Sequence, residues 1–82
     1  MNLAQAPLRT TWRIKQLHTS EDMQDRARQL QEIGFLQGEL VSVLTRGFVG
    51  GDPLVVRVGM STFALRKAEA QCIEIEPKAP HA

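Results

Sequence analysis

The sequence has 82 residues, of which 43% are hydrophobic and 23% are charged, and its formal net charge is +1. This composition is typical of one ordinary globular domain and excludes a polybasic chain, so no nucleic acid is expected as a partner. Cys72 is the only cysteine, which excludes an intramolecular disulfide and indicates a reducing, cytoplasmic setting.

The two ends of the chain show little structural pattern. Residues 1–7 lack the charged start and apolar run that mark a secretion signal. No segment approaches the roughly 20 apolar residues that span a bilayer, so membrane contact is expected only through a partner. We therefore predict flexible tails at residues 1–7 and 77–82, on either side of one folded domain at residues 8–76.

The first predicted strand lies around Trp12 and Ile14. These apolar residues alternate with Arg13 and Lys15, which is typical of a strand that turns one face inward. Trp12 is the largest apolar side chain available to anchor that face.

An amphipathic helix is predicted over residues 21–33. Charged residues cover one side of this stretch, and apolar residues recur at helical spacing on the other. Gly34 follows the last apolar position and can adopt the left-handed conformation that ends a helix, with Phe35 folding back toward Leu30. The predicted apolar face consists of Met23, Ala27, Leu30 and Ile33.

The second half of the chain predicts further short strands. Residues 40–45 are apolar on both faces, as in a strand that is covered on both sides. Residues 54–60 alternate, so this strand is expected to show one face to water. Its inward set is Leu54, Val56, Val58 and Met60. The remaining predicted elements are a turn at residues 59–61, a strand at 63–65, a helical turn at 67–70 and a strand at 72–76 with Ile73 and Ile75 inward.

Three short motifs follow one another in an order and at separations that are typical of one protein family. They are LQEIGFLQGE at residues 30–39, GGDPLVVRV at residues 50–58 and ALRKAEA at residues 64–70. Together they make residues 12–75 resemble the FeoA family of ferrous-iron-transport proteins. The resemblance implies a mainly β fold with one α-helix, in which about five strands form a small SH3-like β-barrel with an inserted amphipathic helix.

The resemblance also implies a function that involves no catalysis by this protein. It implies a small cytoplasmic accessory protein, not an enzyme, that regulates ferrous iron uptake by binding the cytosolic part of FeoB, a membrane GTPase-permease. The resemblance implies no catalytic residues in this sequence. The residues agree, because Ser42, Ser61 and Cys72 have no histidine partner that the sequence identifies.

A glycine-rich loop at residues 47–53 is the main candidate for partner contact. It is not a phosphate-binding loop, because it leads through Pro53 into a strand and lacks the required lysine. Such a tight loop is expected to leave Phe48 exposed as a partner anchor, with a packed hairpin cap as the alternative. A groove between helix and barrel is a further expected contact. The predicted partner-binding residues are Leu36, Gln37, Gly38, Arg46, Phe48, Val49, Gly50 and Gly51.

Donors for a divalent metal such as ferrous iron occur near the predicted start of the helix. His18 and Glu21 supply nitrogen and oxygen ligands there. Helix capping and surface charge are the simpler interpretation, so we assign neither a metal site nor a cofactor. Cys72 and His81 have no partner at ligand spacing.

Two other functions stay open from the sequence. Arg46, Arg57 and Arg66 could form a basic stripe, which would favour an RNA- or ribosome-associated module, although a solvated sheet face explains them equally well. The other alternative is a domain that senses ferrous iron directly. The exposed edges of an incomplete barrel could also pair between copies and form a homo-oligomer.

Overall fold

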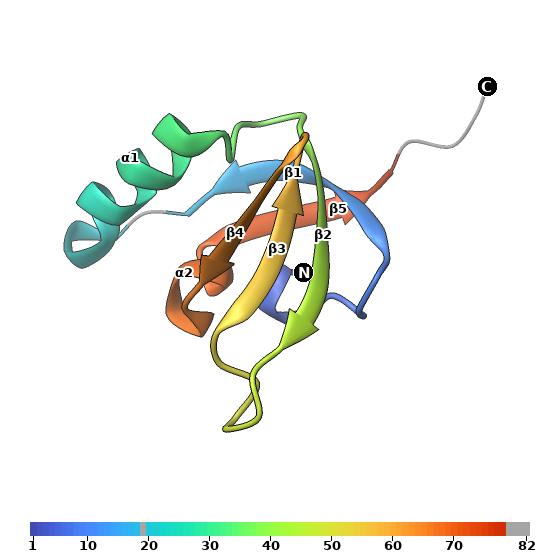
Figure 1. Cartoon of the computed structure of the whole chain (residues 1–82). Helices are drawn as coiled ribbons and strands as arrows, with labels where there is room; N and C mark the ends of the chain where they lie inside the picture. Colours follow the sequence, from blue (N-terminus) through green and yellow to red (C-terminus); the bar gives the residue numbers. More distant parts are fainter. Residues whose placement is uncertain (19, 79–82) are drawn as a thin grey trace.

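Five antiparallel strands form one sheet in the computed structural model, which describes residues 1–18 and 20–78 (Figure 1). The strand order is β4-β3-β2-β1-β5, and every neighbouring pair is antiparallel. β1 and β5 cross behind the other three strands, so the sheet curls into a half-open barrel. The strands are β1 (Thr11–Leu17), β2 (Leu40–Arg46), β3 (Leu54–Val58), β4 (Ser61–Leu65) and β5 (Ile73–Pro77).

In the described part of the chain, one short 3-10 helix precedes β1, a second 3-10 helix and an α-helix lie between β1 and β2, and another α-helix lies between β4 and β5. This arrangement confirms the predicted mainly β fold with one main helix. The helix expected at residues 21–33 begins as one 3-10 turn and continues as an α-helix. The helical turn expected at residues 67–70 is also present. The helices are η1 (Leu3–Gln5), η2 (Glu21–Met23), α1 (Gln24–Ile33) and α2 (Lys67–Gln71).

The end of α1 has the geometry that the sequence predicts. Gly34 has a φ of 123°, which favours glycine. The N–H of Gly34 donates to the carbonyl of Gln31 at 3.2 Å, and the N–H of Phe35 donates to the carbonyl of Leu30 at 2.9 Å. This pair of bonds satisfies two carbonyls at the helix end and turns Phe35 into the core.

One face of α1 is buried, but the apolar stripe is not completely covered. Ala27 and Leu30 are buried, whereas Ile33 is 44% exposed. The side chain of Met23 lies outside the described part of the structure. The helix therefore leaves part of its apolar face open beside the sheet.

The core lies inside the curled sheet. Leu54, Val56 and Val58 are buried, as their alternation predicts, and Ile73 and Ile75 are buried on β5. The remaining members of the core cluster are Leu3, Ala6, Ile14, Leu30, Phe35, Val41, Val43, Leu65 and Ala70, with Ala4, Trp12, Leu17 and Phe63 packed against it.

Two strand expectations were wrong. Met60 is 98% exposed because it occupies the two-residue turn between β3 and β4, where Gly59 has a φ of 57°. β2 is not covered on both sides: Val41 and Val43 are buried, but Leu40 is 37% exposed. The reason is that α1 lies beside the sheet and not over the outer face of β2 (Figure 1).

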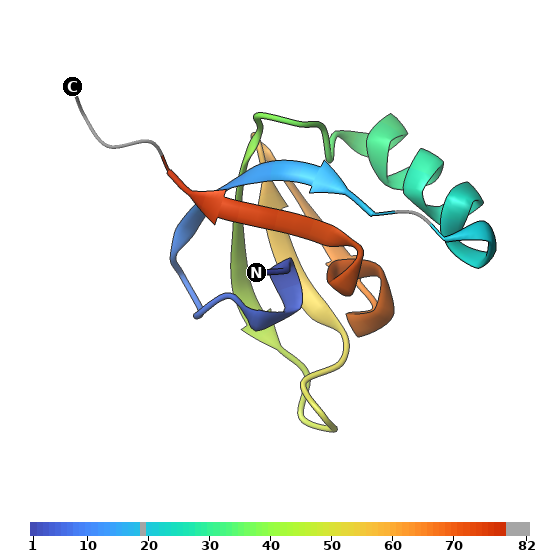
Figure 2. The same ribbon diagram turned by 180° about the vertical axis from the view of Figure 1, so that it is seen from behind.

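The segment at residues 1–7 is not a loose tail, contrary to our expectation. Leu3 and Ala6 are buried in the core, and η1 lies against β5 and α2 (Figure 2). The carbonyl of Met1 also accepts a hydrogen bond from the N–H of Ile75 at 2.8 Å. The segment therefore covers apolar surface that β5 and α2 would otherwise expose.

The other boundary also differs slightly from the expected one. β5 extends through Pro77, so this residue belongs to the sheet and not to a tail. Residues 79–82, including His81, lie outside the described part of the structure. Among the described residues, no helix has the length and hydropathy needed to cross a membrane.

Candidate functional site

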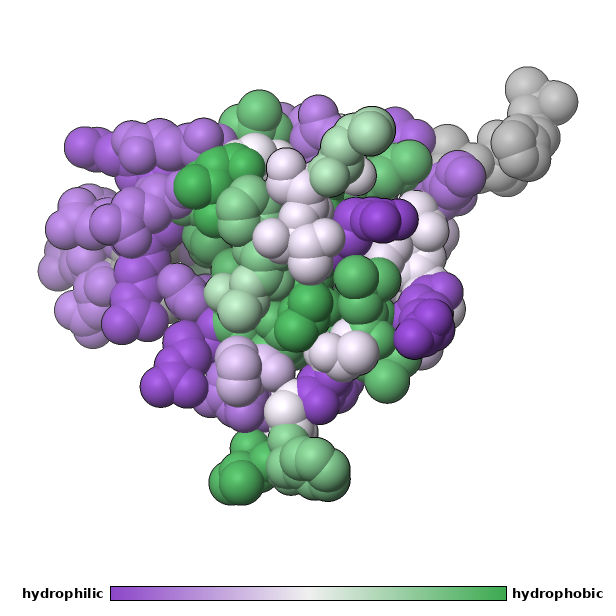
Figure 3. Space-filling view, in the orientation of Figure 1, coloured by the Kyte–Doolittle hydropathy of each residue, from purple (hydrophilic) through white to green (hydrophobic). Residues whose placement is uncertain are grey.

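The loop between β2 and β3 presents an apolar tip. Phe48 is fully exposed, and Val49 is 85% exposed, as the sequence predicts for this loop. The N–H of Gly47 donates to the carbonyl of Pro53 at 2.9 Å, and the N–H of Asp52 donates to the carbonyl of Val49 at 3.3 Å. These hydrogen bonds stabilise the loop while Phe48 and Val49 are exposed to solvent. The space-filling view shows an apolar protrusion at this end of the molecule (Figure 3).

Gly47 is needed for this loop shape. A Cβ atom at this position would lie 2.2 Å from the carbonyl oxygen of Asp52, a backbone atom that has no flexible side chain to move away. The close approach of the two backbone segments thus explains a glycine directly before Phe48.

The other predicted contact segment lies at the opposite end of the barrel. Leu36, Gln37 and Gly38 follow α1 and are exposed. The N–H of Gly38 donates to the carbonyl of Ile14 at 2.8 Å, which ties this segment to β1. The β2–β3 loop projects from the far end of β2 (Figure 1). The structure therefore does not bring the two predicted contact segments together.

Arg46 and Arg57, two of the three arginines considered for a basic stripe, lie on different faces of the sheet. A β-bulge between Val43 and Thr45 shifts the register, so that Arg46 pairs with Leu54 on the inward face. Arg57 pairs with Ser42 and lies on the other face. The sheet therefore does not present these two arginines as one continuous stripe.

Arg46 and Arg66 each have a partner within the chain. Arg46 Nη2 donates to the carbonyl of Ala6 at 2.6 Å, so this guanidinium ties the end of β2 to the N-terminal segment. Arg66 Nη1 lies 3.9 Å from Asp52 Oδ2. Of the predicted partner-binding residues, Arg46 therefore has a structural role in the fold, as does Gly38 through its hydrogen bond to Ile14.

The two metal-ligand candidates, His18 and Glu21, have different surroundings. His18 is hydrogen-bonded to Glu74 across the ends of β1 and β5, whereas Glu21 starts η2. Within residues 1–18 and 20–78, no group of three or more His, Cys, Asp or Glu side chains could hold a metal ion. The observed partner of His18, Glu74, could not be found from sequence spacing because it comes from the last strand.

Cys72 is poorly suited to bind metal or to act as a nucleophile. Burial raises the pKa of its thiol, and the carboxylate of Glu69 raises it further. The Sγ atom donates to the carbonyl of Ala68 at 3.4 Å. Since the thiolate is the reactive form, a raised pKa disfavours both roles.

The cluster around Glu74 predicts an acid-sensitive contribution to stability. The hydrogen bond from His18 is the main cause that holds the pKa of Glu74 below its ordinary value, and Lys15 Nζ, 3.4 Å away, also lowers it. A carboxyl with a lower pKa in the folded chain stabilises the fold above its unfolded pKa and loses this contribution as the pH falls toward the folded pKa. We expect the melting temperature to fall on acidification below pH 4.5.

Thermal unfolding followed by circular dichroism across this range tests the expectation. Glu74→Gln should flatten the acid limb of the curve, whereas Glu76→Gln, on the same strand but outside the cluster, should leave it unchanged. Identical acid limbs for Glu74→Gln and the unmodified protein would contradict the assignment.

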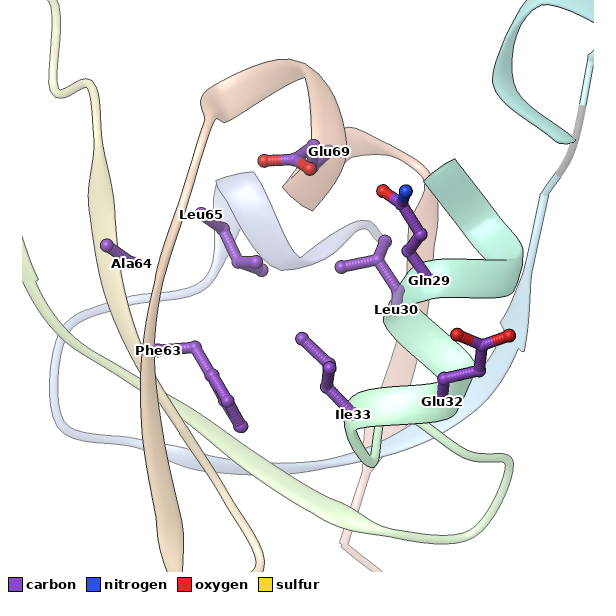
Figure 4. Close-up of a pocket in the computed structure, with 8 residues that line it drawn as sticks. All are labelled: Gln29, Leu30, Glu32, Ile33, Phe63, Ala64, Leu65 and Glu69. Atoms are coloured by element: carbon purple, nitrogen blue, oxygen red, sulfur yellow. The ribbon is translucent and has the colours of Figure 1, made fainter. Parts of the chain in front are cut away.

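A groove of about 380 Å³ lies between α1, β4 and α2 (Figure 4). Its floor is apolar and comes from α1 and β4, while its rim carries polar and acidic side chains. The ring of Phe63 packs against the ring of Phe35, with 5.8 Å between the ring centroids. This is the groove between helix and barrel that the sequence predicts. The residues that line it are Gln29, Leu30, Glu32, Ile33, Phe63, Ala64, Leu65 and Glu69.

A five-stranded antiparallel barrel of this size, with apolar loops and a side groove, has the architecture of a small SH3-like domain. Comparison with protein-family models identifies the particular family. The FeoA domain model matches residues 1–77, and the chain belongs to the FeoA family. The match includes the N-terminal segment, in agreement with its burial in the core. The family is linked to ferrous iron transport and is not a known family of enzymes.

Solved structures support this assignment. Stenotrophomonas maltophilia FeoA, crystallised with zinc and described as a prokaryotic SH3 domain protein, is 38% identical, with a TM-score of 0.83, over 93% of this chain and 89% of that one. The iron(II) transport protein A of Clostridium thermocellum is 32% identical, with a TM-score of 0.78, over 94% of this chain and 45% of that one. A FeoA-like protein from Clostridium acetobutylicum, 20% identical with a TM-score of 0.80 over 100% and 91% of the two chains, shares the fold. A sequence search of the curated proteins found no match.

Proposed function

We propose that this protein is a cytoplasmic accessory and regulatory factor of ferrous iron uptake, which acts by binding the cytosolic part of a FeoB-type GTPase-permease. Membership of the FeoA family supports the link to ferrous iron transport. The S. maltophilia relative is itself described as a candidate ferrous iron transport activating factor. Contact with the membrane then occurs only through the permease.

The observation that carries a role in protein binding is the fully exposed ring of Phe48. Burying such a side chain against a partner contributes roughly 1.5–3 kcal/mol. Because hydrogen bonds at Gly47 and Asp52 already hold the base of the loop, little ordering is needed when a partner binds. The exposed ring of Phe48, on a loop that is already held by hydrogen bonds, has the properties of a residue that anchors a protein–protein interface.

We predict that Phe48→Ala weakens binding to the cytosolic part of FeoB at least about tenfold. The free energy of unfolding should change by no more than about 0.5 kcal/mol, because the ring makes no core contact. Titration calorimetry measures the affinity, and ferrous iron uptake in cells that carry the variant measures the consequence.

Met60→Ala is the matched control, because Met60 is 98% exposed but lies at the other end of the barrel. It should bind FeoB like the unmodified protein. If Phe48→Ala also binds FeoB with unchanged affinity, Phe48 is not the anchor. The proposed function is wrong if the unmodified protein does not bind FeoB and deletion of its gene leaves ferrous iron uptake unchanged.

A further inference from the structure

The two edge strands of the sheet differ in how their outer sides are covered. β5 is covered near its middle, because the N–H of Ile75 donates to Met1 and Glu74 forms a bridge with Asn2. β4 is paired with β3 on one side. Among the described residues, no other backbone group bonds to β4, so its outer side is open.

The turn geometry identifies which backbone groups of β4 face outward. A two-residue turn with a positive φ at Gly59 joins β3 to β4, and Val58 pairs with Ser61 beside it. In such a hairpin the flanking pair exchanges hydrogen bonds, and alternate residues do so along the ladder. The N–H and C=O groups of Thr62 and Ala64 therefore point away from β3 and are available to another strand.

The groove runs beside this open edge. Phe63 and Leu65 of β4 face Leu30 and Ile33 of α1 across it (Figure 4). A strand that pairs with Thr62 and Ala64 would place every second side chain against this apolar floor, since side chains of a strand alternate between faces. The exposed part of Ile33 would then be covered.

The charge of the groove specifies the occupant. Glu32 and Glu69 stand on its rim, and no Lys or Arg is among the described residues that line it. One oxygen of Glu69 accepts a hydrogen bond from the N–H of Arg66 at 2.8 Å, while Glu32 is exposed. Two carboxylates beside an apolar floor favour a ligand that combines apolar and cationic side chains.

We propose that β4 and the groove bind an extended segment of a partner protein as a sixth strand, about five residues long, in which apolar residues alternate with Lys or Arg. Main-chain hydrogen bonds to Thr62 and Ala64 supply affinity, the apolar floor selects alternate side chains, and Glu32 selects positive charge. This site goes beyond the proposed function and is separate from the Phe48 loop.

The test uses the whole protein and a synthetic peptide of alternating valine and lysine, about seven residues long. Titration calorimetry should detect binding, and hydrogen exchange measured by NMR should show the amides of Thr62 and Ala64 slowed at least about tenfold. The amides of Ser61 and Phe63, which already bond to β3, should change less. A peptide with glutamate in place of lysine should not bind.

Charge variants locate the site. Glu32→Lys should weaken binding of the valine–lysine peptide at least about tenfold, whereas Glu76→Lys, on the opposite edge strand, should not change it. Ala64→Pro removes one outward N–H from an edge strand, where proline is tolerated, and should abolish binding. Phe48→Ala should bind the peptide normally, which separates this site from the proposed FeoB anchor.

Several results would overturn the inference. The first is that the valine–lysine peptide does not bind at millimolar concentration. The second is that it binds but does not slow hydrogen exchange of the Thr62 and Ala64 amides. The third is that Glu32→Lys binds the peptide with the same affinity as the unmodified protein. Protection of Thr62 and Ala64 in the absence of peptide, together with a dimer by light scattering, would assign the edge to a second copy of the chain instead.

Discussion

Replacement of Phe35 by alanine is expected to lower the free energy of unfolding by about 3–5 kcal/mol. The side chain is fully buried in the core cluster, where it also supports the ring of Phe63. Its removal loses the transfer free energy of the ring and leaves a cavity between α1 and the sheet. For a domain of this size, the melting temperature should fall by at least about 12 °C. Thermal and urea unfolding measure both quantities.

The adjacent residue provides the control. Leu36 is 48% exposed, so Leu36→Ala should change the free energy of unfolding by less than about 1 kcal/mol. A similar small effect for Phe35→Ala would show that the helix end does not pack into the core as described.

Replacement of Leu3 by alanine is expected to lower the free energy of unfolding by about 2–5 kcal/mol. Leu3 is fully buried although it lies only two residues from Met1 in a three-residue 3-10 helix. Natural domains have total stabilities of roughly 5–15 kcal/mol, so this loss is a large share. Chemical unfolding monitored by the fluorescence of Trp12, which packs against the core, is a suitable measurement.

Leu8 is the matched control, because the same residue type is 47% exposed a few positions later. Leu8→Ala should change the free energy of unfolding by no more than about 0.5 kcal/mol. If Leu3→Ala changes the free energy of unfolding as little as Leu8→Ala does, the N-terminal segment does not contribute to the core.

Elements that depend on neighbouring residues could be predicted from the sequence. The end of α1 requires a glycine at a positive φ and an apolar residue after it, and Gly34 and Phe35 meet both needs locally. The alternation of Leu54, Val56 and Val58 likewise indicates which face of β3 is buried. Exposure of Phe48 follows from the short glycine-rich loop around it.

The register of β2 could not be predicted in the same way. Residues 40–44 are apolar except for Ser42, so the strand fits the core equally well with or without an extra residue. The bulge before Thr45 depends on pairing with β3, and it moves Arg46 to the inward face, where it bonds to Ala6. Local patterns could therefore not decide whether Arg46 and Arg57 share one face of the sheet.

Local patterns in this chain thus specify the strands, the helix and the apolar loop, because each depends on the period and turn chemistry of consecutive residues. The packed N-terminal segment and the acidic groove depend on contacts between distant parts of the chain. Leu3 is buried against elements from the other end of the sequence, and the groove combines Glu32 of α1 with Glu69 of α2. Such contacts exist only once the sheet has curled, since the curl brings these segments together.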